Sequence, residues 1–208
     1  MSTPTPSTDL LRRLEDQRLI AIIRASDADT AAARVQHLVA IGVALVEISL
    51  STPDALETLQ SLSASGGASP SLLGVGTVLT AEDLHRAADA GARFAVTPTT
   101  DPEVLGAAVE RDIPIIPGAA TPSEIQRAVV LGATAVKLFP ASLWSLEAFG
   151  DLRQVFPTVA FVPTGGIDAV QAPRWVGAGA IAVGLGSAVT SADADLADLL
   201  DRLQEVRG

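Results

Sequence analysis

The sequence predicts an α/β fold, a closed (β/α)8 or TIM barrel with an extra N-terminal helix. Short apolar runs recur along the 208 residues, each followed by a segment in which apolar residues have helical spacing. The runs begin roughly 20 to 30 residues apart, the length of one strand and one crossover helix. Strands that are apolar throughout lie in parallel sheets covered by helices, so eight such units favour a barrel. An open doubly wound sheet is the alternative, because sequence patterns indicate strand number better than closure.

Eight buried strands are expected, and capping signals mark several helix starts. The strands are predicted over residues 19–24, 43–49, 72–76, 93–97, 113–116, 134–139, 159–163 and 180–183. The helix starts are Thr52–Pro53, Thr80 with Asp83, Asp101–Pro102 and Thr121–Pro122 with Glu124. The last helix carries Leu196, Leu199, Leu200 and Leu203 on one face, which should pack onto the sheet.

The N-terminal segment is expected to contribute a tail and one helix. Residues 1–8 are polar and rich in proline, which predicts a disordered tail. A helix from Asp9 to about Arg18 precedes the first strand and should cap the lower end of the barrel. Since no change in composition divides the rest of the chain, residues 9–208 are predicted to form a single domain.

The composition argues against several classes of function. A net charge of −10 disfavours nucleic acid as a partner, whereas a small phosphorylated ligand held by local groups is compatible with it. With no cysteine and only two histidines, far apart in the sequence, a metal site is not expected. The opening residues lack the pattern of an export signal, and no apolar stretch reaches the roughly 18 residues of a membrane span. We therefore expect a cytoplasmic protein without a membrane or metal partner.

Lys137 is the strongest candidate for a catalytic residue, because it is the only lysine among 14 basic residues. It stands in an apolar run that reads as a buried strand. A guanidinium keeps its proton at any accessible pH, so arginine cannot replace an amine that must act as a nucleophile. Burial lowers the pKa of an amine and favours Schiff-base chemistry. The alternative is a lysine neutralised by a buried carboxylate.

Glu47 is the second candidate. Strand alternation places Leu45, Glu47 and Ser49 on one face of the second strand, toward the interior. A carboxylate there could act as general acid and base beside Lys137, or it could merely pair with the lysine. The two roles are compatible.

Two glycine-rich segments, 163–167 and 183–187, follow the seventh and eighth strands. Gly165, Gly166, Gly186 and Ser187 lie where barrels of this type usually bind phosphate through backbone N–H groups. The alternative for each segment alone is a tight turn that needs positive φ. Neither segment matches a dinucleotide-binding fingerprint.

Further polar and small residues fall at the ends of predicted strands, where they would line the same pocket. Arg24 ends the first strand and could bind an anion, or it could form a surface salt bridge. Thr77, Thr97–Pro98 and Pro117–Gly118 end the next strands. His37 and His85 fall within predicted helices and are expected to be structural or exposed. Trp144 and Trp175 are expected to be packing or interface anchors.

The order of these motifs resembles one family, the class I aldolases that cleave 2-keto-3-deoxy-6-phosphogluconate or its galactonate epimer to pyruvate and glyceraldehyde 3-phosphate. The resemblance runs from about Arg18 to Ser187 and rests on residues 46–48, 74–78, 97–98, 115–118, 137–140, 163–167 and 184–187. It implies a homotrimer of barrels, a lyase without a cofactor, Lys137 as the imine-forming residue and Glu47 as the proton carrier. It also implies a phosphate site at Gly165, Gly166 and Ser187.

The remaining substrate-binding residues expected from this resemblance are Arg24, Ser51, Thr77, Pro98, Phe139, Thr164 and Gly186. Ser51 departs from the gluconate-type pattern, in which an arginine four residues after the glutamate helps to bind the substrate carboxylate. That task would pass to Thr77, to backbone groups or to Arg24. Galactonate-type members also lack the arginine, whereas Thr164 matches the gluconate type. The choice between the two epimers therefore stays open, as does activity on unphosphorylated 2-keto-4-hydroxy acids.

Two rival functions remain. One is a phosphosugar epimerase or isomerase that uses carboxylates on the same barrel, and the other is a non-catalytic phospho-ligand binder in which Lys137 only offsets Glu47. Neither explains why the one lysine occupies this strand.

Overall fold

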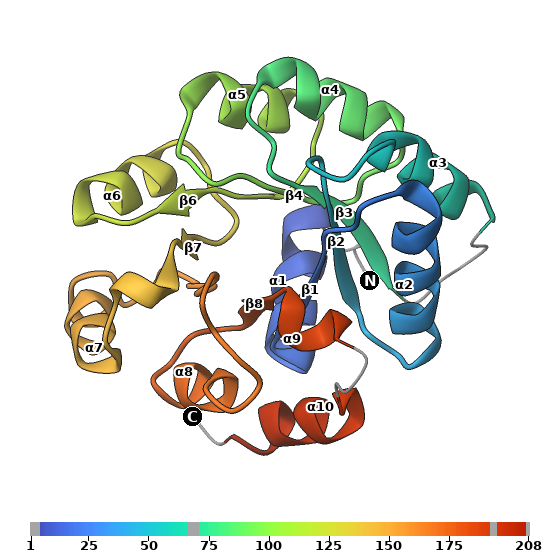
Figure 1. The fold of residues 1–208 in the computed structure, drawn as a ribbon. Helices are drawn as coiled ribbons and strands as arrows, with labels where there is room; N and C mark the ends of the chain where they lie inside the picture. Colours follow the sequence, from blue (N-terminus) through green and yellow to red (C-terminus); the bar gives the residue numbers. More distant parts are fainter. Residues whose placement is uncertain (1–4, 66–70, 192–194, 207–208) are drawn as a thin grey trace.

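The chain folds into a curled parallel sheet with helices around it (Figure 1). This computed structural model describes residues 5–65, 71–191 and 195–206. Six strands pair in the order β5-β4-β3-β2-β1-β8, and β6 pairs with β7. The strands are β1 Leu19–Ile23, β2 Leu45–Ser49, β3 Leu72–Gly76, β4 Ala95–Val96, β5 Ile115–Ile116, β6 Gly118–Ala119, β7 Lys137–Leu138 and β8 Val183–Leu185. All the pairings are parallel, as the apolar strands predicted.

The helices alternate with the strands, and Figure 1 shows α2 to α8 and α10 around the outside. Their bounds are α1 Pro6–Gln17, α2 Ala28–Ala40, α3 Ala55–Ser65, α4 Ala81–Asp89, α5 Pro102–Glu110, α6 Pro122–Val130, α7 Leu146–Val155, α8 Ala172–Gly177, α9 Ser187–Thr190 and α10 Leu196–Glu205, with a 3-10 turn η1 at Ala141–Leu143. The predicted caps at Thr80, Asp101 and Thr121 each accept a backbone N–H of their helix. The start predicted at Thr52–Pro53 is wrong, because Thr52 Oγ1 instead accepts the N–H of Ala25 at 3.2 Å.

Several predicted strands are shorter than expected, and proline accounts for the division of the fifth. Pro114 and Pro117 have no N–H to donate, so the fifth strand is divided into the two-residue segments β5 and β6. Residues 159–163 form no strand of their own and pair through the isolated bridges Val136–Phe161 and Thr164–Gly184. The eighth strand begins at Val183, where the sequence predicted its end.

Two apolar cores lie on opposite faces of the strands. The outer core packs the helices against the strands and includes Phe149, whose ring contacts the rings of Phe161 and Trp175. The inner core takes residues from every predicted strand segment and from α1. Its buried members are Leu10, Leu14, Ile20, Leu45, Leu72, Phe94, Val96, Ile116, Ala135, Val162 and Ala182. Since strand residues alternate between the two faces, the same pattern fixes which polar side chains point inward.

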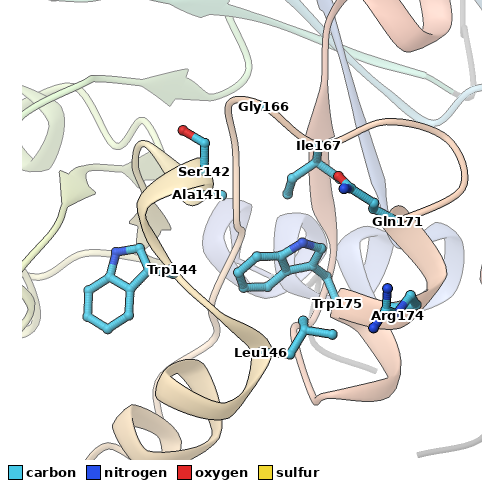
Figure 2. Close-up of a pocket in the computed structure, with 9 residues that line it drawn as sticks. All are labelled: Ala141, Ser142, Trp144, Leu146, Gly166, Ile167, Gln171, Arg174 and Trp175. Atoms are coloured by element: carbon cyan, nitrogen blue, oxygen red, sulfur yellow. The ribbon is translucent and has the colours of Figure 1, made fainter.

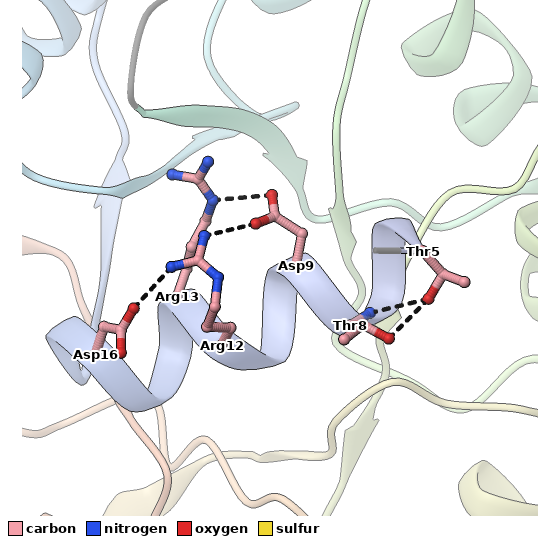
Figure 3. A network of polar contacts seen from close by, with 6 residues as sticks. All are labelled: Thr5, Thr8, Asp9, Arg12, Arg13 and Asp16. Carbon is pink, nitrogen blue, oxygen red and sulfur yellow. Dashed lines mark hydrogen bonds and ion pairs between the residues drawn. The ribbon is translucent and has the colours of Figure 1, made fainter. Parts of the chain in front are cut away.

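Helix α1 covers one side of the inner core. It begins at Pro6, and the Thr5 hydroxyl caps its N-terminus. The predicted tail over residues 1–8 is therefore too long, because residues 6–8 are helical. Residues 1–4 lie outside the described part of the chain. Its other face carries ion pairs of Arg12 with Asp9 and Asp16 and of Arg13 with Asp9 (Figure 3). Within the described residues, no helix has the length and apolar character to cross a bilayer.

Replacing Leu14 by alanine should destabilise the protein by about 3 kcal/mol, because the substitution removes a fully buried side chain and leaves a cavity between α1 and the inner core. Urea denaturation at a fixed protein concentration measures this loss. The exposed neighbour Glu15, replaced by alanine, serves as the control and should change stability by less than about 0.5 kcal/mol. Equal stability of the two variants would contradict the packing of α1 on this core.

Candidate active site

Lys137 and Glu47 project into one cavity from different strands. Lys137 begins β7 and Glu47 is the middle residue of β2; their exposed fractions are 7% and 2%. Both residues line a cavity of about 770 Å³. The other lining residues are Ile22, Arg24, Thr77, Pro98, Phe139, Thr164, Gly165, Gly166, Ile167, Asp168, Gly184, Gly186, Ser187, Ala188 and Ser191. The volume is that of a small-molecule site.

Burial lowers the pKa of the Lys137 amine below its ordinary value of 10.5. The charge of Glu47 opposes this shift, and the charge of Arg24 adds to it. The aromatic ring of Phe139 lies below the amine, with Nζ 4.6 Å from the ring centroid, which offers some stabilisation to a positive charge at this nitrogen. Desolvation outweighs these contributions, and the amine is biased toward its neutral, nucleophilic form.

Burial acts on Glu47 in the opposite sense and raises the pKa of its carboxyl group, although Lys137 and Arg24 both favour the ionised form. Among the described residues, the ion pairs lie within α1, within α10 and between the C-terminal ends of α4 and α5, and none joins Glu47 to Lys137. The two side chains thus face one cavity without neutralising each other through direct contact. This arrangement leaves room for a bound molecule to reach both groups.

The position of the Glu47 carboxyl group depends on a missing side chain. Gly76 ends the neighbouring strand β3, and a Cβ atom on Gly76 would overlap Oε1 of Glu47. The carboxyl group occupies the space that any other residue at position 76 would fill. Gly76 therefore determines where Glu47 can lie in the cavity.

The glycine-rich end of the cavity offers backbone donors. Gly165 and Gly166 have φ values of 92° and 78°, so the tight-turn explanation holds for this segment. Among the described residues, the backbone N–H groups of Gly165, Gly166 and Ser187 donate to no acceptor. Unpaired N–H groups of residues that line a cavity are suited to bind an anion.

A chain of hydrogen bonds also runs along the mouth from Arg24, after β1, to Thr77, after β3. Arg24 Nε donates to Ser51 Oγ at 3.2 Å. Ser49 Oγ lies 2.8 Å from Ser51 Oγ and 2.8 Å from Thr77 Oγ1. Ser49 is completely buried, and Thr77 has a φ of 61°, which is rare for a β-branched residue. Arg24 therefore binds a hydroxyl group of the mouth, and no surface salt bridge to it is found among the described residues.

The cavity is lined by the site residues expected from the sequence except Ser51, which instead accepts a hydrogen bond from Arg24. The expectation that Thr97, Pro117 and Gly118 line the pocket is wrong, because all three are buried in the structure outside the cavity lining. Sequence reasoning missed Ile22, Ile167, Asp168, Gly184, Ala188 and Ser191. Strand alternation could have found Ile22, two residues after the inward Ile20. Asp168 accepts the N–H groups of Val170 and Gln171, which accounts for it as a cap of the turn before α8.

A smaller cavity of about 280 Å³ lies beside Gly166 and Ile167 (Figure 2). Trp144 and Trp175 line it from η1 and α8. Trp175 is buried against Phe149, with ring centroids 5.4 Å apart, which confirms that it packs in the core. In the described part of the chain no three His, Asp or Glu side chains gather as metal ligands would, and the expected absence of a metal stays a prediction.

The chain is similar to known proteins in sequence and in structure. A family model described as KDPG and KHG aldolase matches residues 10–206. The chain is 34% identical to the 2-dehydro-3-deoxy-6-phosphogalactonate aldolase of Escherichia coli K12 over 81% of this chain and 82% of the relative. It is 35% identical to the 2-dehydro-3-deoxy-phosphogluconate aldolase of Treponema pallidum over 76% of this chain and 75% of the relative. The KDPG aldolase structure of Legionella pneumophila, with pyruvate captured as a covalent carbinolamine, is 28% identical with a TM-score of 0.81 and 99% coverage of both chains.

The neutral amine of Lys137 should become available well below pH 10.5. Reductive methylation with formaldehyde and cyanoborohydride across a pH series, read by peptide mass spectrometry, measures this directly because the chain has one lysine. Glu47→Gln should move the inflection to lower pH, since it removes a charge that favours the ammonium. Arg24→Gln should move it to higher pH. An inflection at the ordinary lysine value in the unmodified protein would contradict the desolvated environment.

Gly76→Ala should destabilise the protein by about 2 kcal/mol, because the added Cβ displaces the Glu47 carboxyl group. In a Glu47→Ala background the same substitution should cost much less, and the double-mutant cycle gives the coupling. Gly106→Ala, where a Cβ meets no atom within 4 Å, is the matched control and should leave stability equal or slightly higher. Additive effects of Gly76→Ala and Glu47→Ala would show that Gly76 does not set the position of Glu47.

Proposed function

Since the chain belongs to the KDPG and KHG aldolase family, we propose that it is a class I aldolase that cleaves 2-keto-3-deoxy-6-phosphogluconate or its galactonate epimer to pyruvate and glyceraldehyde 3-phosphate. The observation that carries this proposal is the single lysine of the chain, desolvated in a cavity that it shares with Glu47. The covalent pyruvate adduct of the similar Legionella pneumophila enzyme agrees with chemistry at an amine.

The reaction begins when the neutral Nζ of Lys137 attacks the C2 ketone. Loss of water then gives a protonated imine, which withdraws electrons from the C3–C4 bond. Glu47, directly or through water, removes the proton of the C4 hydroxyl as that bond breaks and glyceraldehyde 3-phosphate leaves. The electron pair remains on C3 as an enamine, to which Glu47 returns a proton. Hydrolysis of the imine releases pyruvate and restores the amine.

The cavity provides a separate place for each end of this substrate. The N–H groups of Gly165, Gly166 and Ser187 would bind the phosphate, with Gly186 allowing close approach of the backbone. Arg24 and Thr77 would bind the carboxylate that gluconate-type enzymes bind with an arginine at the position of Ser51. Pro98, Phe139 and Thr164 line the cavity and would contact the rest of the substrate. Relatives of both epimer types are similar to this chain, so the preferred epimer is left to the assay.

We extend the proposal to the closure of the sheet into a (β/α)8 barrel. Backbone bonds support it on the side where strands are short: Thr134 N–H donates to Ile115, Val136 N–H to Ala160, and Ile181 N–H to Phe161. The first bond joins β5 to the segment that leads into β7, and the second joins that segment to residue 160. The third joins residue 161 to the segment that leads into β8, and β8 pairs with β1. Helix α1 would then close the lower end. One domain over residues 9–208 is consistent with the family match.

A homotrimer and a cytoplasmic location complete the proposal. Val109, Val129 and Val130 are exposed apolar residues on the neighbouring helices α5 and α6, and an interface between subunits would remove such a surface from water. A doubly charged phosphate ester crosses membranes poorly, so its enzyme is expected in the compartment where the sugar acid is made.

Pyruvate release, coupled to lactate dehydrogenase and measured with each epimer, tests the function. Lys137→Met should lower turnover on the order of 10³-fold or more and abolish trapping of pyruvate by borohydride. Glu47→Gln should slow turnover about 10²-fold or more and still allow trapping. Retained activity in Lys137→Met would favour the epimerase or isomerase, and phospho-ligand binding without pyruvate release would favour the silent binder. An unmodified Lys137 after trapping would overturn the proposal.

A further inference from the structure

In the hydrogen-bond chain at the mouth, only the first bond has a fixed direction. Arg24 Nε can only donate, so Ser51 Oγ accepts from it. Ser51 Oγ and Ser49 Oγ lie 2.8 Å apart, as do Ser49 Oγ and Thr77 Oγ1, and either hydroxyl of each pair can donate. In the order that runs outward from Arg24, Ser51 donates to Ser49 and Ser49 to Thr77, which leaves the hydroxyl proton of Thr77 free for a ligand in the cavity.

This order has a physical consequence for ligand binding. A cation at one end of a hydrogen-bond chain polarises each hydroxyl along it, and the last hydroxyl becomes a stronger donor. Thr77 lines the cavity, whereas Ser49 is buried and Ser51 lies outside the lining. The two serines therefore act through their neighbours and do not touch a bound molecule.

We infer that Ser49 and Ser51 are positioning residues that fix Arg24 and orient the Thr77 hydroxyl as a paired donor for the carboxylate of a 2-keto acid. This inference rests on the proposed function and adds to it a mechanism by which an acidic protein with serine at position 51 selects a carboxylate. The backbone of Thr77 supports it. Its φ of 61° is unfavourable for a β-branched residue, and the bond to buried Ser49 helps to hold that conformation.

The alternative is that the chain of hydroxyls only stabilises the loop after β2. Thr52 Oγ1 already links this loop to the loop after β1 by accepting the Ala25 N–H. A purely structural role would affect the handling of charged and neutral ketones equally. A role in directing donors would affect the charged ketone alone. A comparison of pyruvate with its neutral analogue pyruvamide separates the two.

The experiment measures the apparent affinity of imine formation for pyruvate and for pyruvamide by cyanoborohydride trapping on the full chain. The unmodified protein should prefer pyruvate. Ser49→Ala and Ser51→Ala should each lower this preference about tenfold, mainly by lowering the apparent affinity for pyruvate. Ser51→Thr keeps a hydroxyl at an exposed position and should restore most of the preference. In the aldolase assay the alanine variants should raise KM more than they lower kcat.

Ser145→Ala is the matched control. Its hydroxyl caps α7 by accepting the Ala148 N–H, so the variant loses a serine hydroxyl and some stability without touching the chain from Arg24 to Thr77. Its preference for pyruvate should stay within about twofold of the unmodified value. The inference would be overturned if Ser49→Ala and Ser51→Ala left the preference unchanged, or if they lowered the apparent affinities for pyruvate and pyruvamide equally. Failure of the unmodified protein to trap pyruvate would instead defeat the proposed function.

Discussion

Desolvation of one amine is the constraint on which the rest of this site depends. An amine exposed to water would hold its proton near neutral pH and could not attack a ketone, so Lys137 needs a dry interior. The same dryness raises the pKa of Glu47 and brings it toward the range in which a carboxyl group can both take and return a proton. A parallel sheet with apolar faces supplies that interior, because the inner core below the cavity excludes water from the strand ends.

A desolvated amine and a desolvated acid in one cavity would ordinarily form an ion pair, but no salt bridge joins Lys137 and Glu47 among the described residues. The two groups come from strands that do not neighbour each other, β2 and β7. Gly76 provides the space in which the Glu47 carboxyl group lies, and Phe139 lies beneath the lysine. The sheet framework thus brings the two groups to one cavity from separate strands. Stability alone would be better served by apolar residues at both positions.

The periodicity of apolar residues was enough to predict where most strands and helices occur. The bounds of the first three strands were predicted to within two residues at each end. Where prolines interrupt the ladder, as at Pro117, periodicity continued but the strands did not. Lys137 and Glu47 could be recognised because one is the only residue of its kind and the other breaks an apolar face. The hydrogen bond of Ser49 to Thr77 could not be predicted, because the two residues are 28 positions apart and only the pairing of β2 with β3 brings them together.

Arg24 connects substrate recognition to the chemistry of the amine. Its charge lowers the pKa of Lys137, which helps to produce the neutral nucleophile before substrate is bound. A substrate carboxylate bound to Arg24 would offset that charge, and a positive charge at the lysine nitrogen would then be less unfavourable. The protonated imine, which must form next to withdraw electrons, carries its positive charge at this nitrogen. One cation at the mouth would therefore favour the free amine before binding and its charged adduct afterwards, without any movement of the strands.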